Sequence, residues 1–105
     1  MPEDSKLRIL IVGAGKAGEL LSAEIQQDAD SPFEIVGFVD DDKAKQKATI
    51  EGIPVLGTLN ELRKIATDLR VHEIFITIPS ERGQVARNII ESTVGLNVEI
   101  GRAHV

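Results

Sequence analysis

The 105-residue chain contains no cysteine, no tryptophan and no tyrosine, and its only aromatic residues are three phenylalanines. Without cysteine there is no disulfide framework and no thiolate metal site, which fits a reducing compartment. Without tyrosine the chain lacks the residue that commonly serves as acid or base in hydride transfer or epimerisation on a sugar. The two histidines, His72 and His104, have no other candidate nearby in the sequence to form a dyad. The composition therefore favours binding over catalysis.

Long apolar runs and excess positive charge are also missing. No stretch approaches the roughly 20 apolar residues that a membrane span needs, and the N-terminal MPEDSKL has no signal-peptide core. The net charge of -5 repels phosphate backbones, so nucleic acid is not an expected partner. We expect a cytoplasmic chain with no direct membrane contact.

The length bounds the organisation of the chain. Residues 1–105 suffice for one domain but not for a cofactor domain plus a substrate domain. Hydrophobic residues make up 42% and charged residues 28%, as in an ordinary globular domain. We expect a single nucleotide-binding domain that is a piece of a larger protein, whose catalytic domain would be its partner.

Apolar patterning predicts alternating strands and helices. Branched apolar runs predict buried strands, and apolar residues at helical spacing predict amphipathic helices. Thr58 and Glu61 form a capping box that opens the second helix, and Gly95 stands where a helix end favours a left-handed residue. Strands are predicted at 7–12, 33–39, 54–56, 72–78 and 96–100, long helices at 17–28, 59–69 and 85–94, and a short helix at 42–48.

This alternation predicts an α/β fold. Right-handed crossovers between successive parallel strands give a Rossmann-like, doubly wound parallel sheet of five strands, in the order 3-2-1-4-5. In such a sheet, ligands bind at the carboxyl ends of the strands where the strand order reverses.

The stretch IVGAGKAGEL carries three glycines at the spacing G-x-G-x-x-G, between a predicted strand and a predicted helix. In this context the first glycine permits a tight turn, the second lets a pyrophosphate approach the main chain, and the third lets the helix pack closely. The helix N-terminus then favours an anion. The candidate cofactor-binding residues of the loop are Gly13, Ala14, Gly15, Lys16, Ala17 and Gly18; a solvated Lys16 is an equal alternative.

Asp40 ends the second predicted strand, 22 residues after Gly18. A carboxylate there can accept hydrogen bonds from both hydroxyls of a ribose and opposes a 2′-phosphate, which favours NAD over NADP. Asp41 is a further candidate ligand contact, but it or Asp42 can instead cap the short following helix.

Pro79 and Ser80 follow the fourth predicted strand, next to the point where the strand order reverses. Ser80 is a candidate contact for a phosphate or a ribose, and helix capping is the equal alternative.

Four phrases resemble a known family: IVGAGKAGELL, VGFVDDDKAK, IEGIPVLGTLNEL and VHEIFITIPS. They are similar to the amino-terminal Rossmann-like domain of bacterial polysaccharide-biosynthesis nucleotide-sugar epimerase/dehydratases, over nearly the whole chain. The resemblance implies a nucleotide pocket at Gly13, Gly15, Gly18 and Asp40. It also implies that catalysis belongs to a following domain with a Tyr-x-x-x-Lys motif. If the larger protein has membrane helices, the resemblance implies that the present chain lies on their cytoplasmic side.

Related families keep other ligands open. Sugar acyltransferases use a similar pocket for a UDP-sugar, Rex repressors use it for NAD, and CoA-binding domains share the architecture. Glycine spacing cannot separate these ligands, because each offers a pyrophosphate joined to a ribose. The first hypothesis is an NAD-binding accessory domain; the alternatives are a UDP-sugar or CoA module, and a scaffold that forms a homodimer through an exposed sheet edge.

Overall fold

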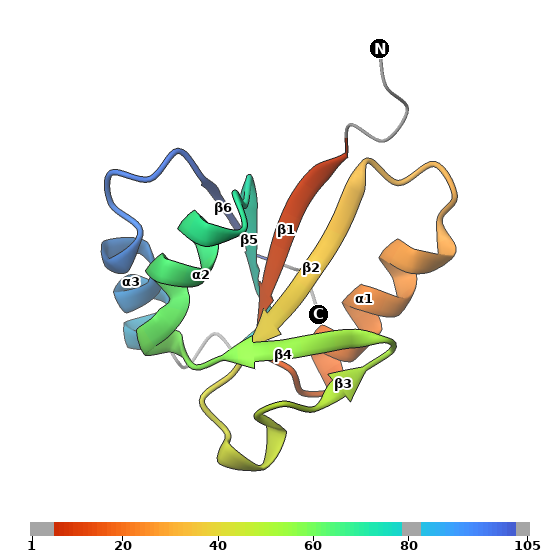
Figure 1. The fold of residues 1–105 in the computed structure, drawn as a ribbon, viewed down its shortest axis with the longest axis horizontal. Coiled ribbons are helices and arrows are strands. Elements are labelled where there is room, and N and C mark those ends of the chain that lie inside the picture. Colours follow the sequence, from red (N-terminus) through yellow and green to blue (C-terminus); the bar gives the residue numbers. More distant parts are fainter. Residues whose placement is uncertain (1–5, 79–82, 103–105) are drawn as a thin grey trace.

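The computed structural model describes residues 6–78 and 83–102. Their strands form a sheet in the order β3-β4-β2-β1-β5-β6 (Figure 1). Helix α1 covers one face of the sheet, and α2 and α3 cover the other. The predicted Rossmann-like α/β architecture is confirmed. The bounds are β1 Leu7–Val12, α1 Lys16–Gln27, β2 Phe33–Val39, β3 Thr49–Ile50, β4 Ile53–Gly57, α2 Leu62–Asp68, β5 Glu73–Ile76, α3 Gly83–Ser92 and β6 Glu99–Arg102.

The predicted strand order holds for the five parallel strands, which run β4-β2-β1-β5-β6. The strand count was wrong, because β3 adds an antiparallel strand at the β4 edge. Ile50 pairs with Ile53, so only Glu51 and Gly52 form the turn, with φ of 54° and 80°. Two successive positive φ values are typical of a type I′ hairpin turn, which suits the twist of the strands.

The short helix predicted at 42–48 is instead one 3₁₀ turn, η1, at Lys43–Lys45. The Asp42 carboxylate caps it by accepting from the backbone N–H of Ala44 at 2.9 Å. The backbone becomes extended at Gln46 and left-handed at Lys47, with φ of 65°. A helix cannot continue through those conformations.

The capping box at Thr58 and Glu61 is present, but the first turn that it opens is a 3₁₀ turn, η2, at Leu59–Glu61, followed by α2. Gly95 has a φ of 90°, as its predicted place after a helix requires. The last strand begins at Glu99 rather than at residue 96, because the N–H of Leu96 donates to the carbonyl of Thr93 in a turn.

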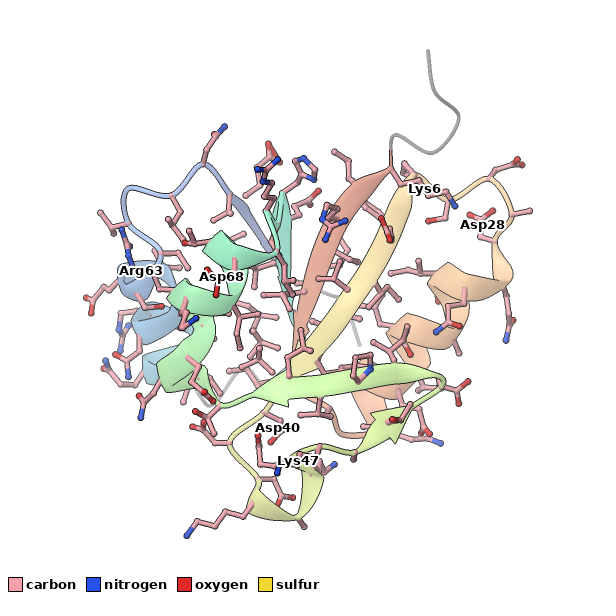
Figure 2. The ribbon with its side chains drawn as sticks, viewed as in Figure 1. Lys6, Asp28, Asp40, Lys47, Arg63 and Asp68 are labelled. Carbon is pink, nitrogen blue, oxygen red and sulfur yellow. The ribbon has the colours of Figure 1, made fainter. Side chains whose placement is uncertain are left out.

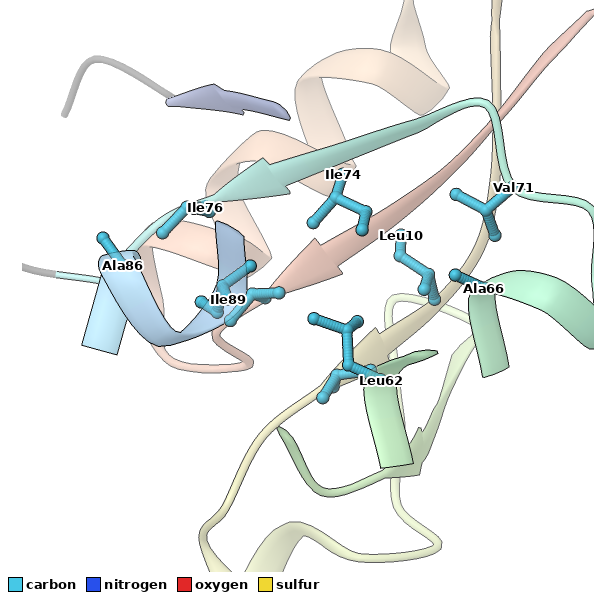
Figure 3. Packing of buried hydrophobic residues seen from close by; sticks show 10 residues of the cluster. Leu10, Leu62, Ala66, Val71, Ile74, Ile76, Ala86 and Ile89 are labelled. Carbon is cyan, nitrogen blue, oxygen red and sulfur yellow. The ribbon is translucent and has the colours of Figure 1, made fainter. Parts of the chain in front are cut away.

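The core has one cluster on each face of the sheet. On the α2 and α3 side, side chains from the central strands pack against both helices (Figure 3). The buried members of that cluster are Leu10, Val12, Val39, Leu62, Ala66, Val71, Ile74, Ile76, Ala86 and Ile89. The α1 side is built on Ile11, Ala14, Phe38 and Val55. Both faces of β1 are therefore buried, as its uninterrupted apolar run predicts.

Arginine side chains hold two helix ends against the rest of the fold. The Nε of Arg8 donates to the carbonyl of Leu69 at 2.7 Å, just past α2. Arg63 donates to the carbonyls of Ser92 and Val94, at 3.1 and 2.7 Å, at the end of α3. A cation at a helix C-terminus is electrostatically favourable. No helix within the described residues is long and apolar enough to cross a membrane.

Candidate functional site

The glycine loop joins β1 to α1 at the carboxyl edge of the sheet. Gly13 has a φ of 106°, and a Cβ there would lie 2.5 Å from Oγ1 of the buried Thr77. A Cβ on Gly18 would lie 1.9 Å from the carbonyl oxygen of Gly13. Both positions therefore need glycine, the first for its backbone conformation and the second for the close approach of α1 to the loop.

Gly15 differs from these two because a Cβ there would meet nothing within 4 Å. It is the N-cap of α1 and supplies no side-chain cap. The first bond of the helix runs from the N–H of Glu19 to the carbonyl of Gly15, at 2.9 Å. The preceding N–H groups, from Lys16 to Gly18, have no acceptor among the described residues, so the first turn of α1 keeps backbone donors without a partner inside the helix.

Asp40 directly follows β2, and its carboxylate contacts this loop (Figure 2). Its Oδ2 accepts from the N–H of Ala14 at 2.7 Å, and its Oδ1 accepts from the N–H of Asp42 at 2.8 Å. Asp40 thus fastens the glycine loop to the β2 edge. A carboxylate has about four acceptor sites, so two of them remain for a ligand.

The neighbouring charged side chains of Asp41, Lys45 and Lys16 interact with other groups of the protein. Oδ1 of Asp41 accepts from the N–H of Leu59 at 2.9 Å, so Asp41 caps η2 rather than the short turn η1 that follows it. Lys45 folds back, and its Nζ donates to the carbonyl of Ala14 at 2.9 Å. Lys16 is exposed and lies 3.5 Å from Glu19, which fits a solvated lysine. Pro79 and Ser80 lie outside the described residues.

Three adjoining hollows follow the carboxyl edge of the sheet. The glycine hollow, of about 320 Å³, lies among Gly13, Gly15 to Gly18, Asp40, Thr77 and Ile78. The aspartate hollow, of about 470 Å³, shares Gly13, Asp40 and Ile78 with it and adds Asp41, Asp42 and Lys45. The α3 groove, of about 520 Å³, shares Asp41, Leu59 and Val85 with the aspartate hollow. Each volume lies within the range of about 300–1,000 Å³ that is typical of ligand pockets.

The polar residues of the α3 groove are absent from the sites predicted above; they are Asn60, Asn88, Glu91 and Ser92. They come from the start of η2 and from α3, segments that are far apart in the sequence. Their patterning is that of solvated helix faces, so the chain alone carries no signal that they line one hollow. Only the packing of α3 beside α2 brings them together.

Groups with perturbed pKa values lie away from these hollows in the described part of the chain. Burial, and then the negative charge of Glu99 on the neighbouring strand, raise the pKa of Glu73 above its usual value. A hydrogen bond from Lys64 to Asp68 raises the pKa of that lysine. Among residues 6–78 and 83–102, no group of three or more acidic or histidine side chains is placed to hold a metal ion. Neither Glu73 nor Lys64 lines one of the three hollows.

A match to a family of known domains decides the classification. The family described as the CoA-binding domain matches residues 3–101. The chain belongs to the CoA-binding domain family. The glycine loop, Asp40 and the hollows beside them all fall within the matched part of this CoA-binding domain.

Two curated relatives are polysaccharide biosynthesis proteins. The domain is 32% identical over 93 residues to "Probable polysaccharide biosynthesis protein EpsC" of Bacillus subtilis, covering 89% of this chain and 16% of that protein. It is 38% identical over 76 residues to the capsular polysaccharide biosynthesis protein CapD of Staphylococcus aureus, covering 71% of this chain and 13% of that protein. The chain therefore spans only a small part of the relatives that it matches, and it resembles a domain found in proteins of polysaccharide biosynthesis.

Solved structures share the fold. The UDP-D-quinovosamine 4-dehydrogenase of Vibrio fischeri superimposes with a TM-score of 0.80 and 30% identity, over 94% of this chain and 79% of that one. RSP in complex with β-NADH superimposes with a TM-score of 0.72 and 15% identity, over 94% of this chain and 54% of that one. The second likeness concerns the fold alone.

Proposed function

We propose that this chain is a nucleotide-binding domain of a polysaccharide-biosynthesis protein, and that NAD is its ligand. The observation that carries the proposal is the glycine loop, where unpaired helix N–H groups and the bare main chain at Gly15 border a hollow. Backbone N–H groups at a helix N-terminus bind phosphate oxygens without any side chain. Gly13, Ala14, Gly15, Lys16, Ala17 and Gly18 are the proposed contacts for the pyrophosphate.

Asp40 is the proposed ribose contact. Its carboxylate is held in place by two backbone N–H groups and keeps acceptor sites for two hydroxyls. The aspartate hollow contains three carboxylates and one ammonium group, so a 2′-phosphate would meet net negative charge. NAD is therefore preferred over NADP. The β-NADH bound to RSP, which has the same fold, adds support for this ligand.

The proposal assigns the chemical step to another part of the protein. The chain has no tyrosine, and the described residues around the hollows offer no acid–base pair. The Vibrio fischeri enzyme is described as a UDP-D-quinovosamine 4-dehydrogenase, so a sugar nucleotide is the class of substrate that the larger protein would act on. On this view the domain is an accessory module of a nucleotide-sugar epimerase or dehydratase.

Thermal unfolding of the chain with NAD, NADH, NADP, a UDP-sugar and CoA in parallel tests the proposal. A ligand at about 100 times its dissociation constant stabilises the folded state by about 2.7 kcal/mol, which is roughly 10–15 °C for a domain of this size. We expect a rise in Tm with NAD and not with NADP. A rise with the UDP-sugar or CoA alone would replace NAD by that ligand, and no rise with any of them would refute nucleotide binding.

A pair of matched variants locates the site. A Cβ on Gly15 or on Gly83 would meet no atom of the described residues within 4 Å, but only Gly15 is among the residues that line the glycine hollow. Gly15→Ala should weaken the NAD response because its methyl group enters the space proposed for the pyrophosphate. Gly83→Ala should leave the response unchanged, and equal loss in both variants would contradict the placement.

A further inference from the structure

The sheet is covered unevenly on the face that carries α1. The buried cluster of that face takes its side chains from β1, β2, β4 and the segments beside them, and none of its described members belongs to β5 or β6. Figure 1 shows α1 on the side of β2 and β4, away from β5 and β6. Parallel sheets occur almost only with both faces covered. Among the described residues, β5 and β6 therefore lack a covering layer on this face.

The strand register identifies the side chains on the uncovered part of the face. Phe75 of β5 pairs with Ile11 of β1, which belongs to the cluster on the α1 side, so both side chains lie on that face. Glu73 lies two residues before Phe75 and shares the face. On β6, Glu99 pairs with Glu73, and Gly101 pairs with Phe75. We call the surface formed by Glu73, Phe75, Glu99 and Gly101 the β5–β6 face.

Apolar surface on the β5–β6 face continues toward β1 and β2. The ring of Phe75 lies over Gly101, because a Cβ on that glycine would lie 3.0 Å from the ring. The same ring meets Phe33 of β2 edge to face, with 5.2 Å between the two centroids. Both rings are half-buried, and Leu7, which pairs with Phe33, is 41% exposed. Apolar side chains that cluster at a surface, rather than stand singly, indicate an interaction site.

Two carboxylates border this apolar surface. Glu73 and Glu99 stand side by side on paired strands, and like charges in that position destabilise a sheet. Neither carboxylate forms a salt bridge with a described residue. Burial, and then the charge of Glu99, raise the pKa of Glu73. A cation placed between the two carboxylates would remove the repulsion.

These charges distinguish between a second copy of the chain and a different partner. In a two-fold dimer the same patch meets itself, so Glu73 and Glu99 would face the same carboxylates of the other copy. The net charge of -5 adds to that repulsion. A segment with aliphatic side chains and a lysine or arginine beside them complements both the phenylalanine rings and the carboxylates. The chain covers 16% and 13% of its two curated relatives, so a larger protein of that kind has sequence that can supply such a segment.

We propose that the β5–β6 face is the docking surface for a basic amphipathic helix from another part of the larger protein. Aliphatic side chains of this helix pack on Phe75 and Phe33, and a lysine or arginine lies between Glu73 and Glu99. A helix is the expected element, because helices cover the faces of parallel sheets. None of these four residues lines the three hollows of the carboxyl edge, so the surface is separate from the proposed nucleotide site.

Nuclear magnetic resonance of the isotopically labelled chain, titrated with a synthetic peptide, tests the surface. The probe is a helical peptide with leucines on one face and lysines beside them. We expect it to shift the amide signals of β5, β6 and the start of β1, and to leave those of α2 and α3 in place. Shifts that gather on α2, α3 or the glycine loop, or no shifts at all, would overturn the proposal. Equal binding of a peptide with glutamate at each lysine position would overturn it too.

Two pairs of substitutions separate local charge from net charge. Glu73→Gln combined with Glu99→Gln removes both carboxylates of the surface and should weaken binding of the leucine–lysine peptide severalfold. Glu51→Gln combined with Glu91→Gln removes two exposed carboxylates, at the β3–β4 turn and on α3, and should leave the affinity unchanged at the same ionic strength. Equal losses in both double variants would show a response to net charge alone and would contradict the placement.

A second matched pair tests the apolar contribution. Leu7→Ser should weaken the peptide, whereas Ile90→Ser, at a position of α3 that is 50% exposed, should not. Both side chains already contact solvent, so both variants should stay folded, which a thermal scan checks. Equal affinity of the Leu7→Ser variant and the parent would contradict packing on this surface. If the signals of β5 and β6 shift with the concentration of the chain alone, the surface belongs to a second copy and the basic partner is wrong.

Discussion

Replacing Asp40 by alanine should both loosen the glycine loop and destabilise the fold. The variant removes the only described acceptor for the N–H of Ala14, a residue that is 3% exposed. A buried N–H left without a partner costs about 1–3 kcal/mol. The N–H of Asp42, an exposed residue, can form a hydrogen bond with water instead, so the loss of its bond to Asp40 adds roughly 0.5 kcal/mol. We expect a total cost of about 2–3 kcal/mol.

Thermal unfolding followed by circular dichroism at constant pH measures this cost. For a domain of about 100 residues it corresponds to a fall in Tm of roughly 8–15 °C. Asp40→Asn keeps one acceptor oxygen and should lose about half as much. Asp30→Ala is the matched control, because its exposed carboxylate has no described partner. A Tm within about 2 °C of the parent for Asp40→Ala would refute the inference that this carboxylate holds the loop.

Other predictions concern the loop and the opposite edge of the sheet. Gly18→Ala should destabilise the fold by about 3 kcal/mol or prevent folding, because its methyl group overlaps the carbonyl of Gly13. Gly15→Ala should fold with a Tm close to that of the parent. Urea unfolding measures both variants, and similar losses of stability in the two would contradict the close packing of α1 on the loop. Glu73→Gln should raise stability near neutral pH. Burial and the charge of Glu99 raise the pKa of Glu73, so the folded state binds this proton more tightly than the unfolded state does. The folded state therefore loses stability as the pH rises from 4.5, the usual pKa of the carboxyl group, through the raised pKa. The gain should vanish well below pH 4.5, and a gain that is the same at every pH in urea unfolding would exclude this cause.

The elements whose signals are local could be predicted from the amino-acid sequence. The apolar run at 7–12 predicts β1 with its observed bounds, the Thr58 and Glu61 pair predicts the helix start, and Gly95 predicts a helix end. These features follow from backbone conformation and from side-chain periodicity, which nearby residues control. The parallel strand order also followed, because the handedness of crossovers leaves few alternatives.

Elements with weak local signals depended on tertiary contacts. The two-residue strand β3 forms because β4 pairs with it across a turn. The segment at 42–48 leaves the helical conformation after η1, and the side chain of Gln46 donates to the carbonyls of Asp40 and Asp42. Neither pairing can be derived from propensity in a short segment.

The candidate site divides in the same way. The glycine spacing and the strand-end aspartate indicated where a nucleotide would lie, because each residue type has a direct chemical role there. The sequence left open whether Asp41 meets a ligand or caps a helix, and the fold turns its carboxylate to η2, 18 residues away in the chain. Other features depend on the tertiary structure. Asp40 and Lys45 form hydrogen bonds with the backbone of Ala14, and Asn60 and Glu91 line the same groove. These residues are far apart in the sequence and meet only when the strands and helices pack.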